Sequence, residues 1–170
     1  AVQSAGKLPL DVSALGADLL TLSAHKFHGP KGAGALYIRS GTETGSLLHG
    51  GHQEARRRAG TENVPAIVGL AKALELSCGE MAQTRARLQQ YDARLCSALL
   101  ALPGVTRNGD EAERIAGLLN FSFGGIESET LILMLDRKGI CVSGGSACAS
   151  GSTDPSPVLS AIGLSRDAAR

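Results

Sequence analysis

A lysine that follows a short apolar segment could support covalent chemistry. Lys26 stands directly after His25 and three positions after Ser23, where the run Asp18–Ser23 ends. A lysine amine forms a Schiff base with a carbonyl compound only when it is deprotonated, so its usual pKa of about 10.4 must be lowered by burial or by a neighbouring cation. His25 and Lys31 could provide that cation. Taken alone, the same residues also fit an exposed turn lysine beside surface histidines.

A thiol is the second candidate for chemistry. Cys148 lies in Gly144–Gly151, a segment of small residues whose glycines permit backbone conformations closed to other residues. An exposed thiolate there could attack a sulfur electrophile, whereas a buried cysteine would only pack. We expect Cys78, Cys96 and Cys141 to be packing residues, the first two on a helical stretch and the third in a strand. No C-x-x-C pair or zinc-type spacing is present, which predicts reduced thiols in a cytosolic protein.

Within the long segment Gly41–Asn63, the residues Gly50–Asn63 collect groups that suit an anion. They include three successive arginines, Arg56, Arg57 and Arg58, together with the hydroxyl of Thr61 and several glycines. Charge-assisted donors and accessible backbone amides are what a phosphate requires. A solvated basic loop that contacts a partner subunit fits the same residues equally well. The lack of clean periodicity predicts a long functional loop.

The composition of the chain limits the classes of function that it could have. The chain has 170 residues, 43% hydrophobic content and a formal net charge of +1, which fits a globular protein with one domain or part of a two-domain unit. Near-neutral charge gives no support for a nucleic-acid surface, and neither a bilayer-length apolar run nor a signal-peptide pattern is present, so we expect no membrane association. Because the sequence begins without Met and stops in a polar segment, we expect parts of the native protein to lie outside it.

The elements that would position Lys26 form the first half of the chain. The run 18–23, the polar turn 24–32 and the run 35–38 predict strand, functional turn and strand. Pro65 then opens a strongly helical stretch that continues to about Leu100, with a break expected at Gly79.

The elements around Cys148 form a smaller α/β unit. Strands are expected at 105–107, 118–123 and 140–143, and a short helix at 155–162. The segment Glu127–Lys138 has apolar residues at helical spacing, with Ser128 as the expected N-cap and Gly139 just past the end. We expect the hinge between the two units within residues 75–103.

Five segments, taken in order, resemble one enzyme family. They are Gln3-Ser4-x-Gly6-Lys7-x-Pro9, Ser23-Ala24-His25-Lys26, Gly50-Gly51-x-Gln53-Glu54, Arg57-x-x-Gly60-Thr61 and Ser146-Ala147-Cys148. Over nearly its whole length the chain is similar to the cysteine desulfurases, fold-type I pyridoxal phosphate (PLP) enzymes of the class-V aminotransferase superfamily, and specifically to the group with a long cysteine loop found in nitrogenase-associated and iron–sulfur-cluster systems. The resemblance implies an α/β fold, with residues 1–75 as the C-terminal part of the large PLP-binding domain and residues 76–170 as a small α/β domain that carries the cysteine loop.

The resemblance also implies roles for residues that would contact the cofactor. PLP would be linked to Lys26, and Gln3 would hydrogen-bond its phenolic oxygen. Ser23 and His25 would contact its phosphate. Thr61 would reach the phosphate bound by a neighbouring protomer, which makes a homodimer part of the implied active site.

The implied reaction takes sulfur from free L-cysteine. PLP would act as the electron sink, Lys26 would move the Cα proton, and the Cys148 thiolate would take the sulfur as a persulfide while alanine is released. The persulfide would then pass to an acceptor protein such as an iron–sulfur scaffold, for cluster assembly or for thio-cofactor or tRNA biosynthesis in the cytoplasm.

Some features depart from the family pattern. Gly144 stands where the family often has serine, and His52 stands where it often has a third glycine. The family's aspartate for the pyridine nitrogen would fall upstream of Ala1, and its substrate-binding arginine would fall beyond Arg170. We therefore expect the chain alone to bind PLP poorly and to be inactive.

Two alternative functions remain open at this level. The first is another class-V PLP lyase, such as a selenocysteine lyase, or an aminotransferase-like enzyme. A loop thiol argues against transamination, which does not need one. The second is a non-catalytic module that docks sulfur acceptors through the small domain.

Overall fold

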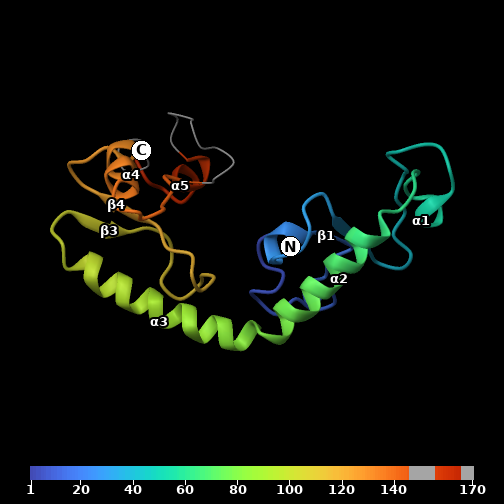
Figure 1. Ribbon diagram of the computed structural model, residues 1–170, viewed down its shortest axis with the longest axis horizontal. Helices are drawn as coiled ribbons and strands as arrows, with labels where there is room; N and C mark the ends of the chain where they lie inside the picture. Colours follow the sequence, from blue (N-terminus) through green and yellow to red (C-terminus); the bar gives the residue numbers. More distant parts are fainter. Residues whose placement is uncertain (146–155, 166–170) are drawn as a thin grey trace. The chain divides into compact units, whose positions relative to one another are not determined.

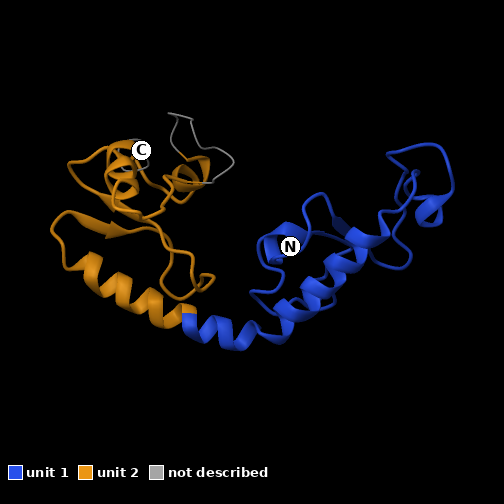
Figure 2. Cartoon of the chain, in the orientation of Figure 1, with its two compact units in different colours: residues 1–87 blue, residues 88–170 orange. Residues whose placement is uncertain are grey.

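The computed structural model describes residues 1–145 and 156–165. Contacts within the chain divide it into two compact units, residues 1–87 and residues 88–170 (Figure 2). The division falls inside one helix, α3, which spans Met81–Leu100. The boundary predicted after residue 75, as the end of a cofactor-binding domain, stays a prediction.

The first unit contains the expected strand, turn and strand. Strand β1 (Leu19–Ser23) pairs antiparallel with β2 (Gly34–Ile38), with Leu19 opposite Ile38 and Ser23 opposite Gly34. Burial alternates along β1, as expected for a strand with one covered face: Leu20 and Leu22 are half-buried, while Leu19 and Thr21 are exposed. The turn between the strands begins with a short 3₁₀ helix, η1 (Ala24–Phe27).

Helix α2 (Val64–Gly79) packs against this turn. Asn63 caps its first turn, since the Asn63 Oδ1 atom accepts a hydrogen bond from the Ala66 backbone at 3.2 Å. Pro65 occupies the first turn, where its missing N–H leaves no helical bond unmade. The helix ends at Gly79 and α3 begins at Met81, so the break predicted at Gly79 is confirmed.

The long loop before α2 contains one unusual helical turn, α1 (Gln53–Arg56), which Figure 1 shows beyond the N-terminal end of α2. Glu54, Ala55 and Arg56 have φ values of 49°, 54° and 67°. These are left-handed conformations, which non-glycine residues rarely adopt in succession because the β-carbon approaches the following carbonyl oxygen.

The second unit contains a small antiparallel sheet. Strands β3 (Val105–Arg107) and β4 (Phe121–Phe123) pair with Val105 opposite Phe123. The expected strand 118–123 is therefore shorter than predicted. Its first residue, Leu118, instead forms a turn in which its backbone N–H donates to the Ile115 carbonyl.

Helix α4 (Ser128–Asp136) confirms the predicted helix but corrects its cap. Glu127 is the N-cap, with extended backbone, and Ser128 is the first helical residue. Gly139 has φ 73° and ends the helical segment as expected. The helix α5 (Pro157–Ala161) falls within the predicted range 155–162, and residue 155 lies outside the described residues.

The strand predicted at 140–143 is wrong. These residues form neither helix nor strand. The Ile140 N–H donates to the Leu135 carbonyl at the end of α4, and within residues 88–145 and 156–165 the strands β3 and β4 pair only with each other. The segment therefore has no described strand edge to join, and apolar composition alone does not form a strand.

No helix in the described part of the chain combines the length and the apolar content needed to cross a bilayer.

Candidate active site

The turn after β1 presents three polar side chains within four residues. The Ser23 hydroxyl oxygen and His25 Nδ1 are hydrogen-bonded at 3.0 Å. Lys26 is half-buried. Two apolar residues of the same turn are fully buried, since Ala24 is 0% exposed and Phe27 is 2% exposed. Ser23, His25 and Lys26, all predicted from the sequence as site residues, therefore lie together on one turn whose apolar residues are anchored.

The Lys26 amine has neither a carboxylate partner nor a hydrogen bond among the described residues. A lysine with a bound counter-ion would have to break that pair before it reacted with a carbonyl group. The turn thus combines an amine that can act as a nucleophile with a hydroxyl and an imidazole, within three residues of it in sequence, that can bind an anionic group.

Small residues on α2 allow the turn to approach the helix closely. Gly69, Ala73 and Ser77 recur every four residues and therefore share one face of α2. A β-carbon added at Gly69 would lie 3.1 Å from the Pro30 ring, and one added at Gly29 would lie 3.2 Å from the Ala73 β-carbon. We call Gly69, Ala73 and Ser77 the small-residue ridge.

The third member of the ridge makes a polar contact. The Ser77 hydroxyl donates a hydrogen bond of 3.2 Å to the Phe27 carbonyl oxygen, across 50 positions of sequence. Sequence reasoning missed Ser77 and the ridge. The four-residue spacing of small side chains on a predicted helix was the available signal, but it did not indicate which segment the ridge contacts.

The segment that carries Gln3 lies against the same turn. The Ala1 nitrogen donates to the Thr21 carbonyl at 2.9 Å, and Ala5, 2% exposed, packs in one cluster with Ala24 and Phe27. Gln3 lies between these two contacts along the chain, and its side chain is exposed. The structure therefore brings the backbone around Gln3 beside the Lys26 turn.

Thr61 is not brought to this turn by any described contact. It is exposed in the loop before α2, as are the three arginines Arg56, Arg57 and Arg58. This loop is held by bonds of its own: Gly60 N–H donates to Gln53 Oε1 at 3.2 Å, and Ala59 N–H donates to the Leu48 carbonyl at 3.1 Å.

The cysteines only partly follow expectation. Cys148 lies outside the described residues. Cys78 and Cys141 are exposed, so their assignment as packing residues is wrong, whereas Cys96 is half-buried. Cys78 follows Ser77 on α2, outside the four-residue spacing of the ridge, and Cys141 lies in a segment that forms no strand. Cys96 contacts Arg107, whose pKa is raised by its hydrogen bonds to Glu111 and to Cys96.

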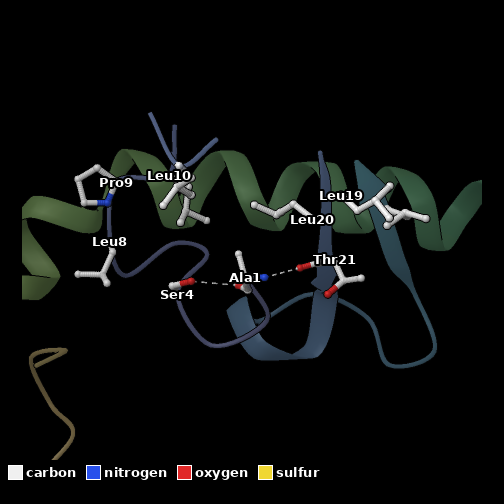
Figure 3. Close-up of a pocket in the computed structure, with 10 residues that line it drawn as sticks. Ala1, Ser4, Leu8, Pro9, Leu10, Leu19, Leu20 and Thr21 are labelled. Atoms are coloured by element: carbon white, nitrogen blue, oxygen red, sulfur yellow. Dashed lines mark hydrogen bonds between the residues drawn. The ribbon is translucent and has the colours of Figure 1, made fainter. Parts of the chain in front are cut away.

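An apolar hollow of about 590 Å³ lies beside β1 (Figure 3). Five leucines and Pro9 make up most of its lining: Leu8, Leu10, Leu15, Leu19, Leu20, Pro9, together with Leu36 of β2. Thr21 and Ser4 are its polar members. The hollow includes none of Ser23, His25 and Lys26, so it is an uncovered sheet surface and not the site of lysine chemistry.

Comparison with known proteins agrees with these features. The family model Aminotransferase class-V matches residues 1–168. A protein named cysteine desulfurase IscS, from Methanosarcina thermophila, is 52% identical over 96% of this chain and 41% of its own length. The chain therefore spans about two fifths of this curated relative.

Solved structures support the fold. A NifS-like protein superposes with a TM-score of 0.87 at 38% identity, covering 99% of this chain and 43% of its own. A structure titled SspA in complex with cysteine superposes with a TM-score of 0.71 at 33% identity, covering 100% of this chain and 46% of its own. The mixed α/β fold of this chain and the match of the family model over residues 1–168 show that the chain belongs to the class-V aminotransferase family.

Proposed function

We propose that this chain carries the cofactor lysine and the sulfur-accepting cysteine of a PLP-dependent cysteine desulfurase. The observation that carries the proposal is the Lys26 turn, which combines an amine that has no partner among the described residues with the hydrogen-bonded pair Ser23 and His25. The names of the relatives support the same activity. Because the chain spans 41% to 43% of those relatives, the reaction of the whole protein is itself part of the proposal.

The residues of the Lys26 turn fit PLP, which has an aldehyde and a phosphate. Lys26 would bind the aldehyde carbon, and the Ser23 hydroxyl and the His25 imidazole would bind the phosphate. The amide of Gln3, which lies exposed on the adjacent segment, would bind the phenolic oxygen. When bound, PLP supplies an electron sink for carbanion chemistry at the substrate Cα.

The proposed substrate is L-cysteine. The SspA structure is titled as a complex with cysteine, which supports this choice. Once released from the cofactor, the Lys26 amine would take the Cα proton and later return it. The Cys148 thiolate would attack the substrate sulfur, so that one S–S bond forms, the substrate C–S bond breaks, and alanine is the second product.

Further partners follow from the same proposal. Thr61, exposed in its loop, would contact the PLP phosphate of a second protomer in a homodimer. The Cys148 persulfide would pass to an acceptor protein such as an iron–sulfur scaffold, in the cytoplasm. The chain alone would be inactive, because it spans only 41% to 43% of the length of these relatives.

The experiment measures alanine and sulfide released from L-cysteine, with a reductant, by the native protein that contains this chain. Lys26→Ala should lose both products, and Cys148→Ser should keep the PLP absorbance band but release no sulfide. The control is Cys141→Ser, which removes an exposed thiol and should change neither product.

Two outcomes would favour other functions. Full sulfide release by Cys148→Ser would exclude the persulfide role and favour a lyase of the selenocysteine type. Failure of the parent protein to bind PLP at all would favour a non-catalytic module that docks sulfur acceptors.

A further inference from the structure

We propose that Ser77 is a positioning residue that sets the separation between the Gln3 segment and the Lys26 turn. The inference rests on the proposed function, because this separation matters when both segments contact one PLP molecule. Ser77 lies near the C-terminal end of α2 and is half-buried. No part of its own side chain is proposed to touch the cofactor.

The first contact of Ser77 is to the Lys26 turn. Its hydroxyl donates to the carbonyl oxygen of Phe27, the residue directly after Lys26, at 3.2 Å. The next residue, His28, has φ 67°, so the chain changes to a left-handed conformation immediately beyond this carbonyl. The bond therefore fixes the peptide group at which the turn reverses, and with it the direction in which the Lys26 side chain leaves the backbone.

The second contact of Ser77 is to the Gln3 segment. A β-carbon added at Gly6 would lie 2.7 Å from the Ser77 β-carbon and 3.6 Å from the Phe27 β-carbon. Gly6 also has φ 72°, a conformation that favours glycine. The backbone three residues after Gln3 thus contacts both Ser77 and the residue after Lys26, and no larger residue fits between them.

The rest of the ridge makes Ser77 a rigid reference point. Gly69 contacts Pro30 and Ala73 contacts Gly29, so the two turns of α2 before Ser77 are also held against the residues that follow Phe27. Ser77 cannot move together with Phe27 if that part of the turn shifts, because Gly69 and Ala73 already hold α2 in close contact with Pro30 and Gly29. The Ser77 side chain therefore contacts both segments proposed to bind the cofactor, and it holds both at fixed positions relative to α2.

The test compares PLP binding by the native protein that contains this chain with binding by its Ser77→Ala variant. The change removes one hydroxyl and leaves the small volume of the side chain nearly unchanged, so we expect the variant to fold, with an unaltered far-ultraviolet circular dichroism spectrum. The loss of one neutral hydrogen bond predicts an increase in the dissociation constant for PLP of roughly twofold to tenfold.

Readouts at saturating PLP separate positioning from simple loss of stability. In Ser77→Ala the visible circular dichroism of bound PLP should fall, and the midpoint of its absorbance change with pH should shift, because the lysine meets the cofactor at a different angle. Ser77→Cys, which keeps a weak donor of similar size, should be intermediate and serves as the test if Ser77→Ala does not fold. Ser97→Ala, on the exposed part of α3, should match the parent.

The results distinguish this inference from the proposed function. If the parent forms a borohydride-reducible PLP adduct that Lys26→Ala loses, the cofactor proposal stands. If Ser77→Ala and Ser77→Cys then match the parent in visible circular dichroism and in pH midpoint, Ser77 has no positioning role. If the parent itself forms no such adduct, both the cofactor proposal and this inference fall.

Discussion

Asp92 and Arg114 form an ion pair that attaches the segment between β3 and β4 to helix α3. The Arg114 Nη1 and Asp92 Oδ2 atoms lie 2.7 Å apart, and the Gly117 backbone N–H donates to the same oxygen at 2.9 Å. Asp92 is only 4% exposed, although most of α3 is exposed. A buried carboxylate with two donors therefore connects two separate segments of the second unit.

Replacement of Asp92 by alanine should destabilise this unit strongly. The change leaves the Arg114 guanidinium and the Gly117 N–H without their acceptor, which predicts a loss of about 2 to 4 kcal/mol in the free energy of unfolding. Urea unfolding followed by circular dichroism measures it. The control is Lys72→Ala, which breaks the exposed pair with Glu75 and should cost less than about 1 kcal/mol. Equal losses in the two variants would contradict this account.

The contact between the turn and α2 leaves no room at Gly29. A β-carbon there would lie 2.9 Å from the Ala24 β-carbon and 3.0 Å from the Ala24 carbonyl oxygen. We expect Gly29→Ala to lower the melting temperature by several degrees, since overpacking costs about 1 to 3 kcal/mol. Gly45→Ala, at a glycine with no atom within 4 Å of an added β-carbon, is the matched control and should leave the melting temperature unchanged.

The left-handed turn α1 predicts a stabilising substitution. Ala55 has φ 54°, so Ala55→Gly relieves backbone strain and should raise the free energy of unfolding by roughly 0.5 to 1 kcal/mol. Ala71→Gly, in the middle of α2, should lower the free energy of unfolding by about 1 kcal/mol, because glycine is a poor helix former. Chemical denaturation of both variants decides the matter: a loss of stability in Ala55→Gly would show that this turn is not left-handed in solution.

Asp110 should contribute to the dependence of stability on pH. Its pKa is lowered by backbone hydrogen bonds from Glu113 and Ala112, at 2.8 Å and 2.7 Å. Because the folded pKa lies below the ordinary aspartate pKa of 3.8, the stabilisation is present above that pH and is lost as the pH falls through the folded pKa. Asp110→Asn should therefore flatten the stability profile below about pH 4. Carboxyl carbon chemical shifts measured during an acid titration report the folded pKa directly, and a value at or above 3.8 would contradict the prediction.

Uncovered apolar surface should make the isolated chain bind hydrophobic dyes. Leu15, Leu19 and Leu36 line the hollow beside β1 and are 60%, 50% and 52% exposed. We expect strong fluorescence from anilinonaphthalene sulfonate with the chain alone. Leu19→Ser with Leu36→Ser should reduce that signal, whereas Leu133→Ser, an exposed leucine of α4, should reduce it less. Equal reductions would show that dye binds apolar side chains without preference for the hollow.

The sequence predicts well those features that depend on neighbouring residues. An apolar run before a polar turn is enough to predict β1 and the position of Lys26, and Pro65 and Gly79 bound α2 because both act on their own backbone. The strand expected at 140–143 fails because a strand also requires an edge to pair with. The cap of α4 is displaced by one residue, from Ser128 to Glu127, and the Glu127 side chain accepts no capping hydrogen bond, so the capping preference of serine did not set the start of this helix.

Contacts between distant segments are the part that sequence alone does not provide. The bond from Ser77 to Phe27 joins residues 50 positions apart, and Gly6 meets Ser77 across an even longer separation. Each of these residues has an ordinary local context, so nothing nearby marks it as part of the site. Lys26, His25 and Ser23 were predictable because they are adjacent in sequence, whereas the residues that hold them are not.

The positions of the small-residue ridge on α2 cannot accept larger side chains. Gly69, Ala73 and Ser77 are already among the smallest side chains, so nearly every single-nucleotide substitution at these positions adds atoms to an interface that has no free space. Neutral drift at one of them would require a simultaneous reduction in size at Gly6, Gly29 or Pro30, and two of those three residues have no side chain left to lose. A saturation library of α2 should therefore show these positions as narrow minima of mutational tolerance, every fourth residue along an otherwise permissive helix.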